Sequence, residues 1–527
     1  MPDSFDHRHQ GQYDDHNHIQ EGRSAAMVWG LRALGLVAAA VVWLAMGASE
    51  GLPPDARNVA AIATLMAVWW MTEAIPLSAT SLLPIVLIPI FTERTVTQAT
   101  APYANPIVFL FLGGFLIAIA MEKWNLHRRI ALKTLAAVGV EPKRIVLGMM
   151  LATGFLSMWV SNTATTLMML PIGMSVLALV IDRSSKQDAS ALNADGRLSD
   201  VINNPEIKAF GVCLMLSIAW SASIGGLGTL LGSPPNAIVA GYAKEELGRE
   251  IGFLQWMVIG TPLAFTFILV AWVLMTRVLY PFKLDEVPGG KQMIDEQIAE
   301  LGPMSQGERM VLFVFLGAAF LWVVPGLLKS LLGLDLGPLS QMNDTAIAIG
   351  AGLVLFLLPA VGRTRMVLDW KDAEDGLPWG VLLLFGGGLS LAGAVGASGL
   401  DQWFGAQVQD LQTLPTLGLV MAVTLLILFL TEVTSNTATA ATFIPVLGGV
   451  AIGIGTDAFA LLIPAALAAT CAFMLPVGTP PNAIVFGTGK VTIAQMAKGG
   501  FVLNIVGVVL ITLFVYVLGG WALGIQF

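Results

Sequence analysis

Two polar triplets, each present twice, carry the chemistry that this 527-residue sequence can perform. Ser-Asn-Thr stands at 161–163 and 435–437, and Pro-Pro-Asn stands at 234–236 and 480–482, each within a largely apolar stretch. Hydroxyl and amide oxygens can complete the shell of a hard cation, and the same groups can donate hydrogen bonds to a carboxylate. We therefore expect these triplets to bind a small cation and an anion as neighbours.

The triplets also predict interruptions of helices inside a membrane. Lipid cannot satisfy polar side chains or a broken backbone, so each interruption must be buried in protein or line a water-filled cavity. The end of one half-helix offers free carbonyls to a cation, and the start of the next offers N–H groups and about half a positive charge to an anion. A single triplet could simply cap or kink a helix, but the duplication of both kinds of break favours a binding site.

The charged and nucleophilic residues near the triplets leave few other chemistries open. Glu432, three residues before Ser435, is the one nearby acid. It could carry a proton, or it could be a neutral or paired group that orients the chain. An intramembrane hydrolase using Ser161 or Ser435 is a remote alternative, because no His lies in a predicted span to act as its base. The sequence also lacks a phosphate-binding Gly-rich loop and a basic, aromatic patch typical of nucleic-acid binding.

The elements that must position these residues are membrane helices. Hydrophobic residues make up 56% of the sequence and charged residues only 12%, against about 25% charged in an average soluble protein. A spanning helix needs about 20 apolar residues. We therefore predict an all-α polytopic membrane protein with eleven transmembrane helices. The predicted spans are 27–48, 57–73, 75–91, 105–122, 209–231, 253–280, 309–328, 343–361, 378–397, 456–476 and 499–524.

Two further apolar stretches, 144–181 and 413–453, are interrupted at their centres by the Ser-Asn-Thr triplets. Each is long enough for two half-spans, so we interpret them as re-entrant hairpins. Two amphipathic stretches, beginning at Leu126 and Leu400, precede the hairpins and are either interfacial arm helices or ordinary loop helices. The polar, His-containing residues 1–26 are expected to form a disordered cytoplasmic tail, with metal binding as the alternative.

The chain repeats itself. The Ser-Asn-Thr triplets lie 274 positions apart and the Pro-Pro-Asn triplets 246 apart, which leaves an insertion of unassigned role at 182–209. We divide the chain into a first helix at 27–56, repeat 1 at 57–280, a cytoplasmic linker at 281–308 and repeat 2 at 309–527. Five crossings in each repeat make the two repeats inverted in the membrane, and the interface of such repeats is where secondary transporters bind their substrates.

The distribution of basic residues predicts the orientation. With the N-terminus in the cytoplasm, 22 of the 27 Lys and Arg residues fall on the cytoplasmic side, as the positive-inside rule requires. The C-terminus is then periplasmic or extracellular, and the protein lies in a bacterial inner membrane.

The motifs resemble those of the divalent anion/sodium symporter family, which includes bacterial dicarboxylate carriers and animal citrate carriers of the solute carrier 13 type. The resemblance covers nearly all of 27–527 and rests on the stretch Trp69–Pro76 and on both pairs of triplets. It implies a homodimer in the lipid bilayer, with a fixed scaffold domain and a transport domain that moves like an elevator.

The resemblance also implies binding residues by motif position. The first Na+ site would comprise Ser157, Ser161, Asn162 and the backbone of Gly232, and the second Thr431, Thr434, Asn436 and the backbone of Gly478. The anion would contact Asn162, Thr163, Ser233, Asn436, Thr437 and Thr479. Some relatives that exchange anions without Na+ have basic side chains in place of the cations, and none occurs at these positions here.

We therefore expect a secondary transporter, not an enzyme, that imports C4 dicarboxylates such as succinate, malate or fumarate with Na+ as the coupling ion. Two carboxylates are costly to bring into a site of low dielectric constant unless charge compensates them, and bound Na+ supplies that charge. Sulfate or a tricarboxylate such as citrate remains an alternative substrate, because the same donors can bind either one.

Overall fold

The structure, a computed structural model, describes residues 24–47, 51–139, 141–191, 204–284, 290–334, 336–361, 365–408 and 413–527. Most of the tail predicted at 1–26, with its histidines, lies outside these ranges. So does most of the second half of the insertion at 182–209. The first described helix begins at Ala25, where Ser24 Oγ accepts a hydrogen bond from the Met27 N–H.

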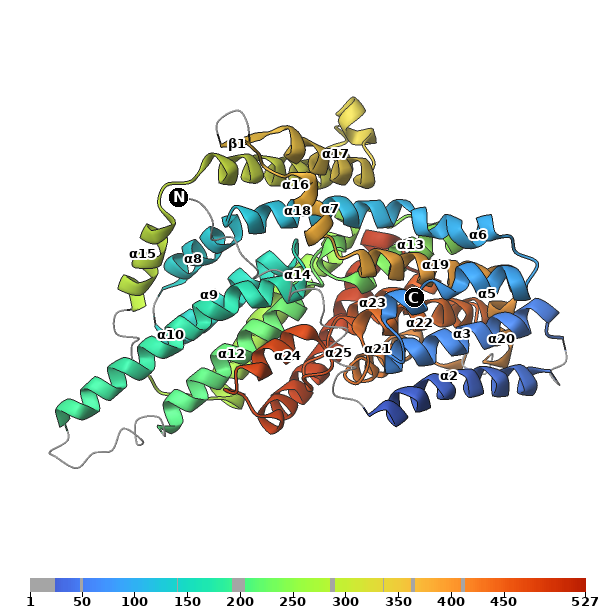
Figure 1. The fold of residues 1–527 in the computed structure, drawn as a ribbon, viewed down its shortest axis with the longest axis horizontal. Helices are drawn as coiled ribbons and strands as arrows, with labels where there is room; N and C mark the ends of the chain where they lie inside the picture. Colours follow the sequence, from blue (N-terminus) through green and yellow to red (C-terminus); the bar gives the residue numbers. More distant parts are fainter. Residues whose placement is uncertain are drawn as a thin grey trace.

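Helices make up nearly all of the described chain, as the composition predicts (Figure 1). The helices up to the linker are α2 (Ala25–Met46), α3 (Pro54–Thr72), α4 (Leu77–Thr80), α5 (Leu83–Phe91), α6 (Val96–Thr100), η1 (Ala101–Ala104), α7 (Pro106–Lys123), α8 (Leu126–Val138), α9 (Pro142–Ser157), α10 (Asn162–Ala191), α12 (Pro205–Gly225), η2 (Leu230–Gly232), α13 (Pro234–Leu247), α14 (Phe253–Leu274) and the π-helical turn η3 (Met275–Leu279).

The second part of the chain continues the same pattern. Its helices are α15 (Gly290–Leu301), α16 (Gln306–Leu332), η4 (Gly337–Gln341), α17 (Asp344–Leu357), α18 (Trp370–Gly376), α19 (Trp379–Ser398), α20 (Leu400–Gln407), α21 (Thr416–Leu430), α22 (Asn436–Gly453), α23 (Ala458–Ala469), α24 (Pro480–Gly487) and α25 (Ile493–Leu523). The only β-strands among the described residues are β1 (Pro359–Val361) and β2 (Arg365–Met366), which form a short antiparallel ribbon.

Nine helices in the described part of the chain are long and apolar enough to cross a membrane, and four shorter apolar helices accompany them. Both returning hairpin helices, α10 and α22, are among the nine. The chain is therefore a multi-pass membrane protein, while the count of eleven crossings stays a prediction. Large apolar side chains such as Leu44, Phe313 and Trp521 are exposed on the outside of the molecule, as lipid-facing positions require.

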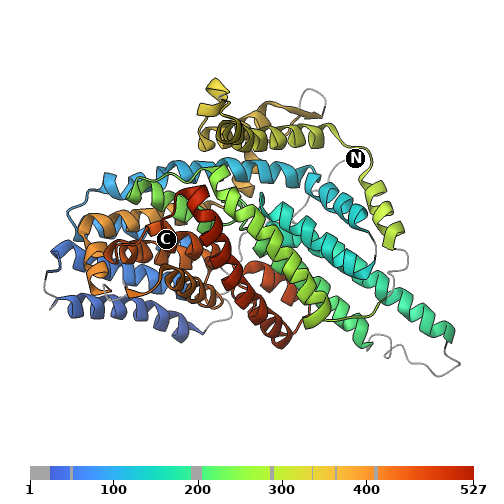
Figure 2. The same ribbon diagram turned by 180° about the vertical axis from the view of Figure 1, so that it is seen from behind.

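Each predicted hairpin consists of two helices that meet at a polar tip. The helices α9 and α10 join at residues 158–161, and α21 and α22 join at 431–435. The helix α10 continues to Ala191, ten residues past the predicted end of its hairpin, and projects from the body of the molecule beside α12 (Figures 1 and 2). The predicted arms are helices α8 and α20, which precede the hairpins.

The two predicted crossing-helix breaks are also present. In the first, α12 ends at Gly225 and α13 begins at Pro234; in the second, α23 ends at Ala469 and α24 begins at Pro480. A proline at the first helical position lacks only an N–H that has no partner within the helix, so it starts these helices without strain.

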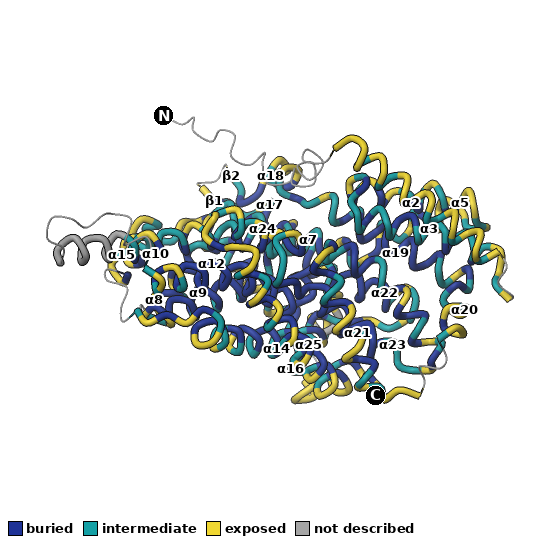
Figure 3. Tube along the Cα trace, turned by 90° about the horizontal axis from the view of Figure 1, so that it is seen from below, coloured by how far each residue is buried: buried dark blue, intermediate teal, exposed yellow. Residues whose placement is uncertain are grey.

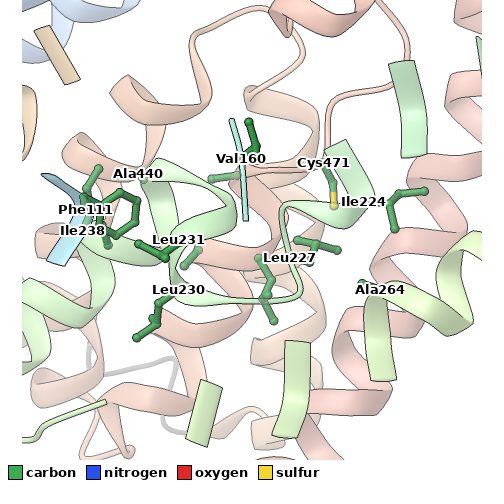
Figure 4. Packing of buried hydrophobic residues seen from close by; sticks show 14 of the residues in the cluster. Phe111, Val160, Ile224, Leu227, Leu230, Leu231, Ile238, Ala264, Ala440 and Cys471 are labelled. Carbon is green, nitrogen blue, oxygen red and sulfur yellow. The ribbon is translucent and has the colours of Figure 1, made fainter. Parts of the chain in front are cut away.

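The broken helices lie at the centre of the molecule. Every residue from Phe210 to Gly225 of α12 and from Phe459 to Ala469 of α23 is buried, whereas α2 is exposed along most of its length (Figure 3). Leu227, Leu230 and Leu231 of the first connection pack in the apolar cluster that also contains Cys471 of the second repeat (Figure 4). This apolar packing holds the unwound segments in place.

An aromatic cluster attaches the first hairpin tip to its surroundings. Trp159 stacks at 5.9 Å on Phe253 of α14 and contacts Phe315 and Trp322 of α16. Phe253 and Trp322 are themselves stacked, with ring centroids 4.5 Å apart. Rings at these separations stabilise each other beyond the burial of their area.

Candidate functional site

The first hairpin tip gathers oxygen atoms around Asn162. The Ser157 hydroxyl, at the end of α9, donates to Asn162 Oδ1 at 2.6 Å and lies 2.7 Å from the carbonyl oxygen of Ala222. The same amide atom of Asn162 is 3.0 Å from the Ala222 carbonyl oxygen and 3.2 Å from that of Gly232. One hydroxyl from α9, one amide from α10, one carbonyl from the last turn of α12 and one from the α12–α13 connection therefore meet at one point.

This donor set fits a hard cation. Neutral hydroxyl, amide and carbonyl oxygens are the ligands that such ions take in proteins, and carbonyls of interrupted helices supply them in transporters. With its oxygen inward, Asn162 completes the oxygen cluster. Turned by 180°, its NH2 group donates to the carbonyls of Gly232 and Ala222 instead. In one orientation of the Asn162 side chain these oxygens can surround a cation. In the other orientation the carbonyls accept hydrogen bonds from the Asn162 NH2 group.

Glycines permit the close approach of the first break to the tip. A Cβ atom on Gly226 would lie 2.8 Å from Asn162 Oδ1, and one on Gly232 would lie 2.5 Å from the Gly226 carbonyl oxygen. Only residues without a side chain can bring the backbone this near to the Asn162 amide.

The second tip repeats the plan with Thr431 in the place of Ser157. Its hydroxyl contacts Asn436 Oδ1 at 2.8 Å and the Ala469 carbonyl oxygen at 3.1 Å. Asn436 Nδ2 points to the Thr470 carbonyl oxygen at 3.5 Å. The residue pairs Ser157–Asn162 and Thr431–Asn436 are separated by the same 274 positions, so both repeats build a similar oxygen cluster.

A hydrogen bond between the repeats joins the two clusters. The Thr470 hydroxyl donates to Ser233 Oγ at 2.9 Å. Ser233 follows Gly232 of the first cluster, and Thr470 supplies the carbonyl that faces Asn436 in the second. The sequence-predicted residues Asn162, Gly232, Ser233 and Asn436 are therefore brought together in one connected group of polar atoms.

The ends of helices supply the groups that an anion needs. Ser435 and Ser233 precede α22 and α13 without capping them through their side chains, which leaves the N–H groups of the first turn of α22 available. Thr163 and Thr437 are partly exposed, and no hydrogen bond in the described structure occupies their hydroxyls. Helix N-termini with adjacent hydroxyls form a binding site for anions.

Three predicted site hydroxyls have other partners in the structure. Ser161 Oγ accepts from the Ala164 N–H at the start of α10, and Thr479 Oγ1 accepts from the Asn482 N–H at the start of α24. The Thr434 hydroxyl bonds to the Leu430 carbonyl and to Thr439 Oγ1. Ser161 and Thr434 lie at the hairpin tips and Thr479 at the second crossing-helix break, but their side chains hydrogen-bond to the local chain.

Gly478 lies against the second tip. A Cβ atom there would be 3.0 Å from the Glu432 carbonyl oxygen and 3.3 Å from its carboxylate. The predicted backbone ligand of the second site is therefore next to the hairpin, although the carbonyls that contact the Thr431 and Asn436 side chains are those of Ala469 and Thr470.

Glu432 holds the second break in place. Its carboxylate, in a residue only 3% exposed, accepts hydrogen bonds from the N–H groups of Phe473, Met474 and Leu475 and from Asn504 Nδ2 at 2.8 Å. Of the two interpretations that the sequence leaves open, this arrangement favours a partnered group that orients the chain.

Sequence reasoning missed the carbonyls of Ala222, Ala469 and Thr470 and the Ser233–Thr470 contact. Any residue offers a carbonyl, so alanines at 222 and 469 gave no signal. Thr470 is the first residue of the second break, and the 246-residue spacing makes it equivalent to Ile224 in the first repeat. The comparison of repeats could not identify it.

Residues 26–524 match the protein family described as "Sodium:sulfate symporter transmembrane region". The sodium-dependent dicarboxylate transporter SdcS of Staphylococcus saprophyticus is 43% identical over 489 residues, covering 92% of this chain and 90% of that protein. The SdcS protein of Staphylococcus aureus strain MRSA252 is 43% identical over 479 residues, covering 90% and 88%.

Two solved structures share the fold. The YdaH transporter of Alcanivorax borkumensis superposes with a TM-score of 0.54 at 13% identity, covering 81% of this chain and 89% of that one. MtrF of Neisseria gonorrhoeae gives a TM-score of 0.54 at 15% identity, covering 94% and 95%. At this identity the likeness concerns the fold alone.

Proposed function

The chain belongs to the sodium:sulfate symporter family and is a Na+-coupled membrane transporter, and within that class we propose that it carries C4 dicarboxylates such as succinate, malate and fumarate into the cell. The observation that carries this proposal is the joining of two matched oxygen clusters by the Ser233–Thr470 hydrogen bond. Relatives at 43% identity, named sodium-dependent dicarboxylate transporters, support the substrate class.

The arrangement suits a molecule with two similar ends. Asn162 and Thr163 in one repeat and Asn436 and Thr437 in the other offer equivalent amide and hydroxyl donors. Ser233 already accepts a hydrogen bond from Thr470, so its own hydroxyl hydrogen is free to point toward a carboxylate. A dicarboxylate would place one carboxylate against each repeat.

Sodium ions supply the compensating charge. Residues 157–163, 232–236, 431–437 and 478–482 contain no Lys or Arg, so no side chain of these segments neutralises the substrate. A cation at each oxygen cluster would lie beside the anion and lower the cost of desolvating it. Because such coupling is reciprocal, the anion strengthens Na+ binding to the same extent.

The proposed motion is that of an elevator, in which the hairpins and broken helices slide as a transport domain past a scaffold. Two glycines 274 positions apart, Gly114 of α7 and Gly388 of α19, support this motion because they leave no side chain to obstruct it where these helices contact the broken segment and α22. A Cβ atom on Gly114 would lie 2.5 Å from the side chain of Leu231, and one on Gly388 would lie 3.3 Å from that of Ala441. A homodimer in the lipid of the inner membrane, with a cytoplasmic N-terminus and a periplasmic or extracellular C-terminus, completes the proposal.

Uptake into proteoliposomes tests the proposed substrate. Labelled succinate, citrate and sulfate are supplied with an inward Na+ gradient, with equal Na+ on both sides, or with K+ in place of Na+. We expect saturable succinate uptake that requires the Na+ gradient and that malate and fumarate inhibit. Preferred transport of sulfate or citrate would overturn the substrate, and uptake of equal rate in K+ would overturn the coupling.

Two matched variants test the site. Asn162→Ala and Asn436→Ala each remove the amide at the centre of one cluster, so we expect uptake to fall roughly 10- to 100-fold while the proteins remain folded. Size-exclusion profiles and thermal unfolding provide the control for folding. Wild-type uptake in both variants would contradict the assignment of the site.

A further inference from the structure

A second asparagine in each repeat fastens the broken segment behind the oxygen clusters. Asn236, the third residue of α13, donates both hydrogens of its side-chain amide, to the carbonyls of Gly226 and Thr229, at 2.9 Å each. Asn482, the third residue of α24, donates in the same way to the carbonyls of Ala472 and Leu475, at 3.0 Å each.

The two arrangements are equivalent by position as well as by geometry. Asn236 and Asn482, Gly226 and Ala472, and Thr229 and Leu475 are each separated by 246 residues. Both asparagines are fully buried. Two hydrogen bonds reproduced across repeats whose other residues differ indicate that the repeats have a common requirement for this amide.

The contacts also have a cost that a purely structural residue would avoid. Asn236 Oδ1 and Asn482 Oδ1 are buried, and neither has a hydrogen-bond partner in the described structure. An unpaired buried acceptor opposes folding. The two donors of the amide, which no apolar side chain could replace, offset that cost by fixing two carbonyls each.

In the first repeat, the fastened carbonyl is adjacent to the cation oxygens. Gly226, whose carbonyl Asn236 holds, packs directly on the Asn162 amide and on the Gly232 carbonyl. Gly232 in turn supplies the oxygen 3.2 Å from the Asn162 amide. The length of the Asn236 side chain therefore fixes the position of Gly226, and through it the distance of the Gly232 carbonyl from the Asn162 amide.

In the second repeat, the fastened carbonyls flank the segment that Glu432 also holds. Ala472 contacts Gly478, and the Leu475 N–H donates to Glu432 while its carbonyl accepts from Asn482. Thr470, whose carbonyl faces Asn436, lies two residues before Ala472. Asn482 thus controls the path of the chain that carries the Thr470 carbonyl.

We propose that Asn236 and Asn482 are positioning residues that set the spacing of the carbonyl oxygens at the first and second cation clusters, and thereby the preference for Na+ over the smaller Li+. The inference rests on the proposed Na+ coupling, but not on the identity of the anion. The spacing of oxygens selects among cations because each ion requires its own distance to its ligands.

Cation binding to the purified protein tests this without any transport. Thermal unfolding of wild type, Asn236→Ala and Asn482→Ala is followed against NaCl and LiCl, with total chloride held constant by choline chloride. We expect the half-saturating Na+ concentration to rise roughly 10-fold or more in each variant, and the ratio of the Li+ to the Na+ half-saturation to fall toward one. The two effects should multiply in the double variant, since each residue serves its own cluster.

Three further variants keep the test decisive. Asn343→Asp, in which either side chain caps α17, introduces a charge elsewhere and should leave both half-saturations unchanged. If an alanine variant does not fold, Asn236→Gln and Asn482→Gln retain the amide but displace it by one methylene, and they should alter the Li+ to Na+ ratio. Folded variants with the wild-type ratio would overturn the proposal. Absence of succinate uptake by the wild type would refute only the proposed substrate, because the cation-dependent unfolding is measured without succinate.

Discussion

The two hairpin tips present the same kinds of oxygen atom, but different contacts hold each tip in place. At the first tip, the Thr229 hydroxyl of the broken segment donates to the Met158 carbonyl. At the second tip, Glu432 occupies the position equivalent to Met158, and its carboxylate binds the backbone of residues 473–475 instead. The broken segment donates the hydrogen bonds in both repeats, but the side chain that makes the attachment belongs to the segment in the first repeat and to the hairpin in the second.

The environments of the tips differ as well. Trp159 is packed among the aromatic rings of α14 and α16, whereas Val433, the equivalent residue of the second tip, is 61% exposed. The first tip is therefore anchored from outside by ring packing, and the second from inside by a buried carboxylate. Duplicated chains can thus keep the atoms that contact a ligand while replacing the supports around them.

The largest expected effect follows from removing the internal support. Glu432→Gln turns an acceptor of four N–H groups into a side chain with a donor of its own, which leaves buried donors unpaired at a cost of about 3 kcal/mol. We expect Na+-driven uptake to fall by roughly 100-fold and the unfolding temperature to drop. Met158→Leu, at the equivalent position, should change neither quantity. Normal uptake by Glu432→Gln would show that the carboxylate does not organise the second cluster.

Removing the external support should have a smaller effect, and on stability above all. Trp159→Ala deletes a ring that contacts three others, so we expect a loss of about 2–3 kcal/mol. Val433→Ala, at the exposed equivalent, should cost less than about 0.5 kcal/mol. Thermal unfolding of the two variants side by side measures the difference. Equal losses would mean that the tips are supported alike.

A third pair of variants compares the hydroxyls at the clusters themselves. Ser157→Ala and Thr431→Val each remove one oxygen from a proposed cation site, so we expect the half-saturating Na+ concentration of uptake to rise about fivefold, the equivalent of about 1 kcal/mol. The exchanges Ser157→Thr and Thr431→Ser retain the oxygen and should remain close to wild type. A shift in only one repeat would identify the cluster that is occupied during transport.

The smallest expected effect concerns the arm helices and pH. On the first arm, Arg129 of α8 forms an ion pair with Glu308 at the start of α16, with 2.7 Å between Nε and Oε1. The second arm, α20, carries Asp401. Burial raises the pKa of Asp401 on α20 above 3.8, so its ionisation lowers stability as the pH rises through the raised value.

Unfolding temperatures of the wild type and Asp401→Asn, compared between pH 8 and pH 4, test this sign. We expect a slight stabilisation of the wild type on acidification that is absent from Asp401→Asn. The same pH dependence in both proteins would show that the ionisation of Asp401 does not affect stability.

Much of the fold could be predicted because polar and proline-containing triplets interrupt the apolar stretches where the helices end and begin. Pro234 and Pro480 begin helices where predicted, and Asn162 and Asn436 begin the returning helices of the hairpins. The supports were not predictable in the same way. Met158 and Glu432 differ in kind, so the repeat offers no rule for them, and the contact of Trp159 with α16 joins residues far apart in the chain.

The stack of Phe253 on Trp322 gives the protein a built-in optical sensor. Indole emission depends on the immediate surroundings of the ring, and a ring centroid 4.5 Å away is a large part of those surroundings. If α14 shifts against α16 during the cycle, the fluorescence of Trp322 changes without any attached dye. The emission of a Trp322→Phe variant gives the contribution of the remaining tryptophans. Subtracting it from the wild-type spectrum leaves the signal of Trp322 and so reports on the contact between α14 and α16.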